Sequence, residues 1–437
     1  MVARTLTAII IQLEHGGTLF LDDLTYFQMA RDVVQGNTAH WDSYTRFLYN
    51  STATFELPLT GLMALFGAHH FVGQLTSAAF GTAAAGMCCR LALEFMAARW
   101  ALMAGTAVAL LPSQVVFSSV GLKDGAVWAT TASVALLAVV TARCSLKRLP
   151  WLLALLGFAL LCAVYLRIQS AIVLSWALIL SAWVGSRQVR VARAIGVLAI
   201  ALGVPALVGV GPAGITFAAS RSHDLTTIRY NNAVGAATAL VGTSPSAPSG
   251  HRGAGPGGGS GVQRPAGGSG VQRPAGGSGV QSPVGGSGVQ SPVGGSGSQG
   301  GAAQAVANGE ALSTNFGYLP KGLLVMLVDP KPWVSTTDTH VKEARDEEVL
   351  WYPLLALGVI GIVEAIRRRS QLYQQLLVPL LFGAGSVVMY GLSEGNFGTA
   401  YRHRGEVVWP IALFAALGAA SLWGVLARRR LSAAPPR

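Results

Sequence analysis

The stretch that decides the fold, residues 376–427, reads LLVPLLFGAGSVVMYGLSEGNFGTAYRHRGEVVWPIALFAALGAASLWGVLA. Two of the most apolar runs in the chain, 376–392 and 407–427, flank the polar run EGNFGTAYRHRGE at 394–406. Each apolar run is close to the length of about 20 residues that a helix needs to cross a bilayer. The stretch therefore predicts two membrane helices, with charged residues placed against the mouth of the second.

The rest of the chain has the same apolar character. Of its 437 residues, 51% are hydrophobic and only 11% are charged, whereas soluble domains carry about 25% charged residues. The formal net charge of +12 would suit a nucleic-acid binder, but the cations fall in short clusters between apolar segments. We therefore expect a polytopic membrane protein whose partners include membrane lipids and not nucleic acid.

The predicted fold class is all-α, a polytopic transmembrane helical bundle of about ten spans. The first window is short for a span, and no signal peptide is expected, because Glu14 interrupts the apolar run and no small-residue cleavage site follows. The segment 57–66 is too short to cross and is expected only to enter the interface. The windows lie at residues 5–20, 69–89, 100–119, 125–142, 150–166, 168–186, 192–211, 350–366, 376–392 and 407–427.

Lysine and arginine residues give the predicted orientation. With the N-terminus in the cytoplasm, sixteen of them face inward and six fall in the short outer loops, which is the bias of the positive-inside rule. Both termini are then cytoplasmic. The inner residues are Arg4, Arg90, Arg99, Arg143, Lys147, Arg148, Arg187, Arg190, Arg193, Arg367, Arg368, Arg369, Arg428, Arg429, Arg430 and Arg437, and the outer residues are Arg31, Arg46, Lys123, Arg167, Arg402 and Arg404.

Three parts follow from this threading. Residues 1–211 form a module of about seven spans with an acidic first outer loop, and residues 350–437 form a module of about three spans. Between them, residues 212–349 make one long outer loop, and its centre at 258–299 repeats GGSGVQRPA and then GGSGVQSPV. A calcium-binding β-roll would need Asp where these repeats have Val-Gln, so the Gly-, Ser- and Pro-rich composition predicts a disordered tether. After it, 315–333 reads as an amphipathic segment on the membrane, with Trp333 as its anchor.

The first outer loop begins FLDDLTYFQMARDVVQG and places two carboxylates directly after the first helix. Asp22 and Asp23 head a short amphipathic helix that we expect to lie along the membrane. Acids at a helix N-terminus are favoured by the helix dipole, so capping alone explains them. The alternative is that one carboxylate caps while the other faces a cavity as a general base. Tyr26, one turn later, is a further site candidate.

Two more outer loops contribute charged residues. Lys123 and Asp124 follow one another in FSSVGLKDG, where an ion pair closing a hairpin and a role in a site are both open interpretations. Arg167 lies where almost no loop separates two spans, so its guanidinium sits at membrane depth or at the outer interface. A charge there is expensive and indicates function, unless the side chain reaches the outer headgroups.

Arg402, His403 and Arg404 precede the last span on this same outer face. The positive-inside rule does not explain cations on that side. Because arginine makes bidentate bonds to phosphate, we predict that the three residues bind the phosphate of a lipid in the outer leaflet. Simple contact with anionic headgroups is the alternative. Further candidates in this set are Glu394, Asn396 and Lys321.

Carboxylates and cations on one face of the membrane suit transfer from a lipid-phosphate donor. A carboxylate would take the proton from an acceptor hydroxyl, and the cations would bind and stabilise the departing phosphate. The predicted phosphate-binding residues are Arg402, His403, Arg404, Arg167 and Lys123. The chain has no P-loop and no G-x-G-x-x-G after a strand, so no nucleotide site or other cofactor is predicted. An acidic pair can bind a divalent cation, but two adjacent aspartates supply few ligands and no metal site is predicted.

At these residues the chain resembles the GT-C-type membrane glycosyltransferases, the superfamily of protein O-mannosyltransferases and aminoarabinose transferases. The likeness rests on DD-x-x-Y-F-x-x-A-R-x-x-x-x-G at 22–36 and on LPSQVVFSSVGLKDG at 111–125. YLRIQSAIVL, YLPKGLLVMLVDPKPW and GNFGTAYRHR are similar to segments of uncharacterised bacterial members. The resemblance covers most of the chain apart from the repeat, and the second acid is Asp where many members have Glu.

This resemblance implies an inverting enzyme of the bacterial plasma membrane that uses a polyprenyl-phosphate-linked sugar. The role of catalytic base would fall on Asp22 or Asp23, and Arg402 and Arg404 would become phosphate ligands. The acceptor would be a glycan, a lipid or a protein at the outer face. Because the long outer loop is mostly repeat, the resemblance does not imply how the acceptor is recognised.

Two other functions compete with sugar transfer. A polymerase or ligase of lipid-linked oligosaccharides would use similar outer-face cations to hold a pyrophosphate. A lipid or solute transporter would place its charged sites near the bilayer midplane, often within paired repeats. The two halves of the chain show no internal symmetry, and apart from Glu14 and Glu364 the predicted spans are nearly free of charge.

Overall fold

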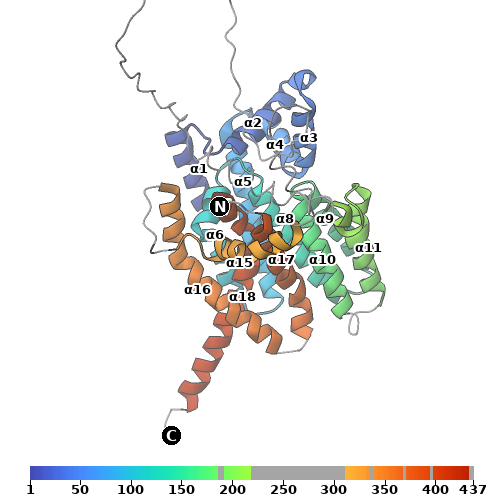
Figure 1. Ribbon diagram of the computed structural model, residues 1–437, viewed down its shortest axis with the longest axis vertical. Coiled ribbons are helices and arrows are strands. Elements are labelled where there is room, and N and C mark those ends of the chain that lie inside the picture. Colours follow the sequence, from blue (N-terminus) through green and yellow to red (C-terminus); the bar gives the residue numbers. More distant parts are fainter. Residues whose placement is uncertain are drawn as a thin grey trace, which may run out of the picture.

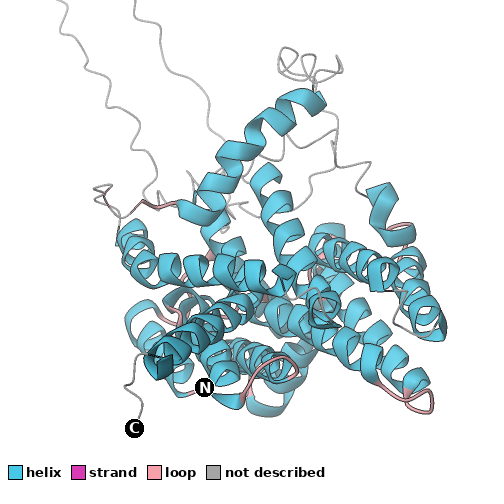
Figure 2. Ribbon diagram, turned by 90° about the horizontal axis from the view of Figure 1, so that it is seen from below, coloured by secondary structure: helices cyan, strands magenta, loops and turns pink. Residues whose placement is uncertain are grey.

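Every regular element of the described chain is a helix. The computed structural model contains no strand within those residues (Figures 1 and 2), which confirms the all-α fold class. The repeat at 258–299 lies outside the described part, as do Glu394 and Asn396. The structure describes residues 1–185, 191–217, 311–331, 333, 339–367, 371–393 and 397–432.

The described helices fall into two groups along the chain. The first group is α1 (Val2–His15), α2 (Leu21–Val34), η1 (Asn37–His40), α3 (Ser43–Ser51), α4 (Ala53–Phe66), α5 (His70–Leu93), α6 (Ala98–Leu110), α7 (Pro112–Phe117), α8 (Asp124–Arg143), α9 (Leu149–Val164), α10 (Ile168–Gly185), α11 (Val191–Leu207) and η2 (Pro212–Gly214). The second group is α15 (Ala311–Val328), α16 (Thr339–Arg367), α17 (Gln371–Ser393) and α18 (Phe397–Ser432).

Within the described ranges, four helical segments are long and apolar enough to cross a membrane, which is typical of a membrane protein. Several shorter apolar helices accompany them, among them α6, α9 and α11. The total of about ten spans stays a prediction. The four segments are Asp124–Arg143, Ala344–Arg367, Gln375–Ser393 and Gly398–Ala427.

Each predicted window falls on a helix, but several windows differ from their helix in extent. α1 ends at His15, before its window ends at 20, and α16 begins at Thr339, before its window begins at 350. The window 100–119 is divided into α6 and α7, because Leu111 precedes a proline and is extended with φ −59° and ψ 128°. The last window begins at 407, whereas α18 begins at Phe397 and continues through the polar run. Arg402, His403, Arg404 and Glu406 therefore lie on a helix and not in a loop.

Glycines let the long helices approach closely. A Cβ built on Gly418 of α18 would clash with the backbone carbonyl of Leu357 in α16, and one built on Gly361 would clash with the carbonyl of Phe414. α5 and α8 meet in the same way, since a Cβ on Gly125 would lie 2.8 Å from the carbonyl oxygen of Ser77. Small residues at helix crossings are characteristic of membrane bundles.

Arg4 has a different environment from the cytoplasmic anchor that the sequence predicted. Its guanidinium is 1% exposed and donates to Ser118 Oγ at 2.7 Å. It also donates to the carbonyl oxygens of Val108 at 3.1 Å and Ala109 at 3.0 Å. In an unbroken helix these carbonyls would accept from residues 112 and 113, but Pro112 has no N–H. Arg4 thus satisfies the carbonyls that the break between α6 and α7 leaves open.

The short helices α2, α3 and α4 gather at one end of the molecule, and the last turns of α18 project from the opposite end (Figure 1). α2 packs against α4, and α1 packs against α5 and α7. This end also receives the loop before α8, because Gly121 lies against Asp23 and Gly73. The arrangement brings the first and second predicted outer loops together.

Candidate functional site

Arg402 joins two carboxylates from distant parts of the chain. It lies in the second turn of α18, and its Nε donates to Asp124 Oδ2 at 2.7 Å. Its Nη1 donates to Asp22 Oδ2 at 2.5 Å. One guanidinium therefore joins residues of the first outer loop, the second outer loop and the polar run. A common site formed by these three segments requires such a meeting.

The contacts continue inward from Asp124 as a chain of alternating charges. Asp124 Oδ1 accepts from Arg167 Nη2 at 2.8 Å, and Arg167 Nη1 also donates to Glu406. Asp124 and Glu406 are 0% exposed and Arg167 is 9% exposed. We call the five residues Asp22, Arg402, Asp124, Arg167 and Glu406 the ion-pair chain.

The ion-pair chain is open at only one end. The side chains of Asp22 and Arg402 are 26% and 19% exposed, whereas the inner members are buried. Buried charges are tolerated only when they are paired and hydrogen-bonded. The inner pairs are therefore fixed, and Arg402 is the cation of the ion-pair chain that a ligand from outside can reach.

Several residues of this region were not identified from the sequence. Glu406 also accepts from Ser170 Oγ at 2.5 Å and from the Tyr390 hydroxyl at 2.6 Å. The signal for Glu406 was its spacing of four from Arg402, which places both on one face once the polar run is helical. Glu56, in the first turn of α4, is 0% exposed, and neither of its oxygens is bonded by a described residue. Glu56 could have been found in the sequence as an acidic residue inside an apolar segment.

Arg404 points away from the ion-pair chain. Two residues along a helix are on nearly opposite faces, so Arg402 and Arg404 cannot share a direction. The Arg404 guanidinium is 1% exposed and donates to Glu348 and to the backbone carbonyls of Met326 and Asp329. All three of its nitrogens are engaged, so binding a phosphate would require one of these bonds to break.

Contacts around Arg404 hold α18 against its neighbouring helices. The guanidinium carbon lies 5.1 Å from the ring centroid of Trp351 in α16. Glu347, beside it, accepts from Ser113 Oγ at 2.8 Å and from the Tyr401 hydroxyl at 2.9 Å. These contacts tie α16 to α7 and α18.

The remaining predicted residues surround the ion-pair chain or lie apart from it. Lys123 Nζ is 5.9 Å from the ring centroid of Tyr26, and burial lowers the pKa of Lys123 to about 8. The His403 ring stacks on Tyr390, with centroids 4.3 Å apart. Lys321 is exposed on α15, where its Nζ lies 5.7 Å from the centroid of the Tyr318 ring.

Asp23 has a role distinct from that of Asp22. Its Oδ2 accepts from the backbone N–H groups of Leu19 at 2.9 Å and Phe20 at 3.4 Å, and so caps the start of α2. Its Oδ1 is buried without a hydrogen-bond partner among the described residues. Burial raises the pKa of Asp23 to about 6. One carboxylate therefore both caps the helix and offers a free oxygen, while its neighbour pairs with Arg402.

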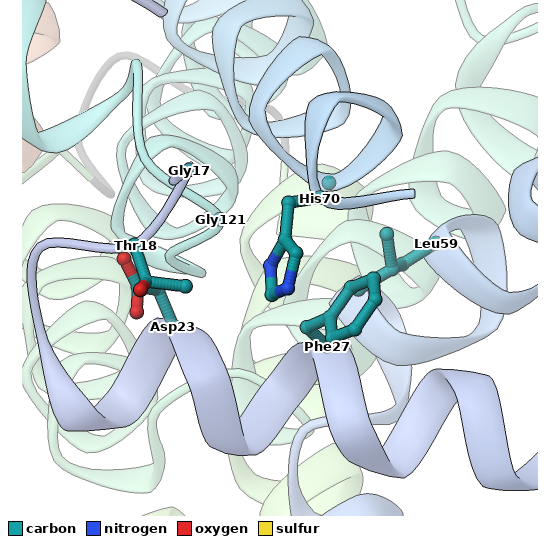
Figure 3. Close-up of a pocket in the computed structure, with 8 residues that line it drawn as sticks. Gly17, Thr18, Asp23, Phe27, Leu59, His70 and Gly121 are labelled. Atoms are coloured by element: carbon teal, nitrogen blue, oxygen red, sulfur yellow. The ribbon is translucent and has the colours of Figure 1, made fainter. Parts of the chain in front are cut away.

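Asp23 also lines a small pocket (Figure 3). The pocket lies between α2, α4 and α5, beside the loops that follow α1 and precede α8. Among the described residues, no group of three or more His, Cys, Asp or Glu side chains is placed to hold a metal ion. The residues that line the pocket are Gly17, Thr18, Asp23, Phe27, Leu59, His70, Gly73 and Gly121.

No family model matches this chain, and no curated protein or solved structure matches it significantly. The chemistry of the site is therefore inferred from its own residues.

Proposed function

We propose that this protein is a membrane glycosyltransferase that moves a sugar from a polyprenyl-phosphate donor to an acceptor hydroxyl. The reaction takes place at the outer face of a bacterial plasma membrane. The donor phosphate binds Arg402, and Asp23 is the general base. Asp22 and Asp124 orient Arg402 from either side.

The position of Arg402 is the observation that supports this proposal. It is the exposed cation of the ion-pair chain, held by Asp124 at one nitrogen and by Asp22 at another. No described residue accepts a hydrogen bond from its Nη2. A guanidinium at the rim of an apolar bundle is suited to a lipid phosphate, because its planar donors match the phosphate oxygens.

The surroundings of Asp23 support its role as the base. A base works best when its pKa is near the working pH, so that it is ionised and still accepts a proton. A pKa near 6 meets this condition, Asp23 lines the pocket, and its Oδ1 is bonded by no described residue. Asp22 is a weaker candidate because its carboxylate is occupied by Arg402.

The transfer step balances with these residues alone. The acceptor O–H gives its proton to Asp23 Oδ1, and the acceptor oxygen forms a bond to the anomeric carbon of the sugar. The bond from that carbon to the phosphate oxygen breaks, and its electron pair stays on the polyprenyl phosphate. Arg402 stabilises the charge that develops there. Attack opposite the leaving phosphate inverts the anomeric centre.

The test uses the full chain reconstituted in liposomes with a panel of polyprenyl-phosphate hexoses and pentoses. Release of polyprenyl phosphate is measured with methanol and water as acceptors. We expect Arg402→Gln to lower the rate by about 100-fold, the usual cost of losing one stabilising donor. Arg46→Gln, at an exposed arginine of α3, is the matched control. Wild-type rates in a folded Arg402→Gln variant, or no release from any donor by the wild type, would refute the proposal.

A further inference from the structure

The pocket beside Asp23 contains one polar atom that lacks a partner. Asp23 is 2% exposed, and its Oδ1 is bonded by no described residue. Leaving a buried acceptor unpaired destabilises the folded protein. The other carboxylate oxygen is fixed by the N–H groups of Leu19 and Phe20. The free oxygen is therefore held in a set direction, as expected of an atom that receives a ligand.

His70 and Thr18 are the other polar side chains of the pocket, and His70 carries the aromatic ring. Its imidazole lies between Asp23 and Thr18 on one side and Phe27 and Leu59 on the other (Figure 3). The ring stacks on Phe27 with centroids 3.6 Å apart and an interplanar angle of 21°. This stacking holds the imidazole in place, and its two nitrogens supply hydrogen-bonding atoms opposite the carboxylate.

Two glycines make room for a ligand between these groups. A Cβ built on Gly73 would lie 3.7 Å from Leu59 Cδ1 and 3.9 Å from Gly121 Cα. One built on Gly121 would lie 3.8 Å from Asp23 Cβ. A methyl group at either position would therefore fit in ordinary contact but would occupy the pocket. The space that remains suits one water-sized group and not a phosphate or a sugar ring.

We propose that this pocket is the subsite for the reacting hydroxyl, and that His70 binds that hydroxyl together with Asp23. The ligand is a single O–H group, either the alcohol of the acceptor or the water that replaces it during hydrolysis of the donor. The proton passes to Asp23 Oδ1, and His70 hydrogen-bonds the acceptor oxygen and directs it. This inference rests on the proposed function, because it names where the acceptor of that reaction binds.

Two variants and a matched control test the subsite. Gly73→Ala fills the pocket, whereas Gly86→Ala adds the same methyl to the same helix in open space, since nothing lies within 4 Å of a Cβ there. His70→Phe keeps an aromatic ring against Phe27 and removes both nitrogens. Polyprenyl-phosphate hexose is the donor, methanol and water are the acceptors, and binding of polyprenyl phosphate is measured in parallel.

We expect Gly73→Ala and His70→Phe to lower transfer to both acceptors by at least about 10-fold, with unchanged affinity for polyprenyl phosphate. Gly86→Ala keeps the wild-type rate. Wild-type transfer by both folded pocket variants would overturn the subsite and leave the proposed function standing. Loss of polyprenyl-phosphate affinity in step with the rate would also overturn it, because the pocket would then serve the donor.

A second measurement does not depend on activity. A cryo-EM map of the full chain that resolves ordered water should show one oxygen within hydrogen-bond distance of both Asp23 Oδ1 and His70, and none there in Gly73→Ala. An empty pocket in the wild type, or His70 turned away from Asp23, would refute the subsite whatever donor the protein uses.

Discussion

Two adjacent aspartates differ in what surrounds each carboxylate. Asp22 reaches Arg402 in α18, while Asp23 turns inward, caps α2 and keeps one oxygen free. The sequence left two interpretations open: either the acids only cap the helix, or one caps while the other acts as a general base. The structure places the cap and the free oxygen on Asp23, so in the proposed reaction the helix cap also orients the base.

Replacing Asp23 by asparagine should increase stability at high pH and abolish transfer. Burial raises the pKa of Asp23 from 3.8 to about 6, so the folded state disfavours the ionised form. Its contribution to stability is complete below about pH 4 and is lost as the pH rises through 6. Asp23→Asn should therefore match the wild type at pH 4 and exceed its unfolding free energy at pH 8 by up to about 3 kcal/mol.

Thermal unfolding in detergent at the two pH values measures this difference. Asp42→Asn is the control, because Asp42 also caps a helix but its hydrogen bond to the Thr45 N–H lowers its pKa. That variant should gain nothing at pH 8. A wild-type melting temperature for Asp23→Asn at pH 8, together with retained transfer, would show that Asp23 is ionised without cost and is not the base.

The roles of Arg402 and Arg404 could not be separated from the sequence. The sequence predicts both cations in a loop before the last span, in which neighbouring side chains have no fixed relation. In α18 the two guanidinium groups point in opposite directions, one to the rim and one into the contact with α15 and α16. Glu406 was missed for the same reason.

At the scale of the elements, residues of two other helices, α1 and α16, stabilise the break at Pro112. Arg4 of α1 donates to the carbonyls that lack a partner at the end of α6 and to Ser118. Glu347 of α16 accepts from Ser113, the first residue beyond the proline. The break between α6 and α7 thus depends on residues far away in the sequence, and the hydropathy of 100–119 alone could not reveal it.

Arg4→Leu should destabilise the protein by at least about 2 kcal/mol, because it leaves buried carbonyl oxygens without donors. Adding Pro112→Ala restores an N–H within reach of the Val108 carbonyl, so the double variant should recover part of the loss. Melting temperatures of the single and double variants check this pair. Equal stability of Arg4→Leu and wild type would mean that water reaches these carbonyls.

The crossing of α16 and α18 depends on glycine. Gly418→Ala should lower the unfolding free energy by about 1–3 kcal/mol, because the added methyl meets the backbone of Leu357. Gly424→Ala, two turns later in α18, has open space around its Cβ and should be neutral or slightly stabilising. Thermal unfolding of the two variants distinguishes the steric effect of the added methyl group from the effect of alanine on helix propensity. Equal melting temperatures would contradict the close crossing.

Helix positions were largely predictable, and their ends were not. The apolar windows located α5, α8, α16 and α17, because hydropathy depends on composition alone. α18 extends beyond its window, since its polar N-terminal turns are stabilised by partners that no local pattern reveals. The ion-pair chain neutralises those charges through Asp22, Asp124 and Arg167, all of them remote in sequence.

At the scale of the whole molecule, the short helices α2–α4 and the rim of the ion-pair chain share one end. The proposed orientation places this end outside the cell and the C-terminal turns of α18 in the cytoplasm. That assignment comes from the distribution of lysine and arginine, and it decides whether the site meets donors in the outer leaflet.

Cysteine labelling tests this orientation. Arg46 in α3 and Arg148 before α9 are both exposed, and the proposal puts them on opposite faces. In a background without native cysteines, Arg46→Cys should react with a membrane-impermeant maleimide in intact cells. Arg148→Cys should react only after permeabilisation. The reverse pattern would place the site in the cytoplasm and exclude an outer-leaflet donor.

The most direct measurement for sugar transfer is a cryo-EM structure of the full chain in a lipid nanodisc with polyprenyl phosphate bound. We predict that the phosphate oxygens accept from Nη2 of Arg402, while Asp124 and Asp22 stay bonded to Nε and Nη1 and Asp23 lies beside the site of the donor sugar. A phosphate bound elsewhere, with no contact to Arg402, would contradict the proposal.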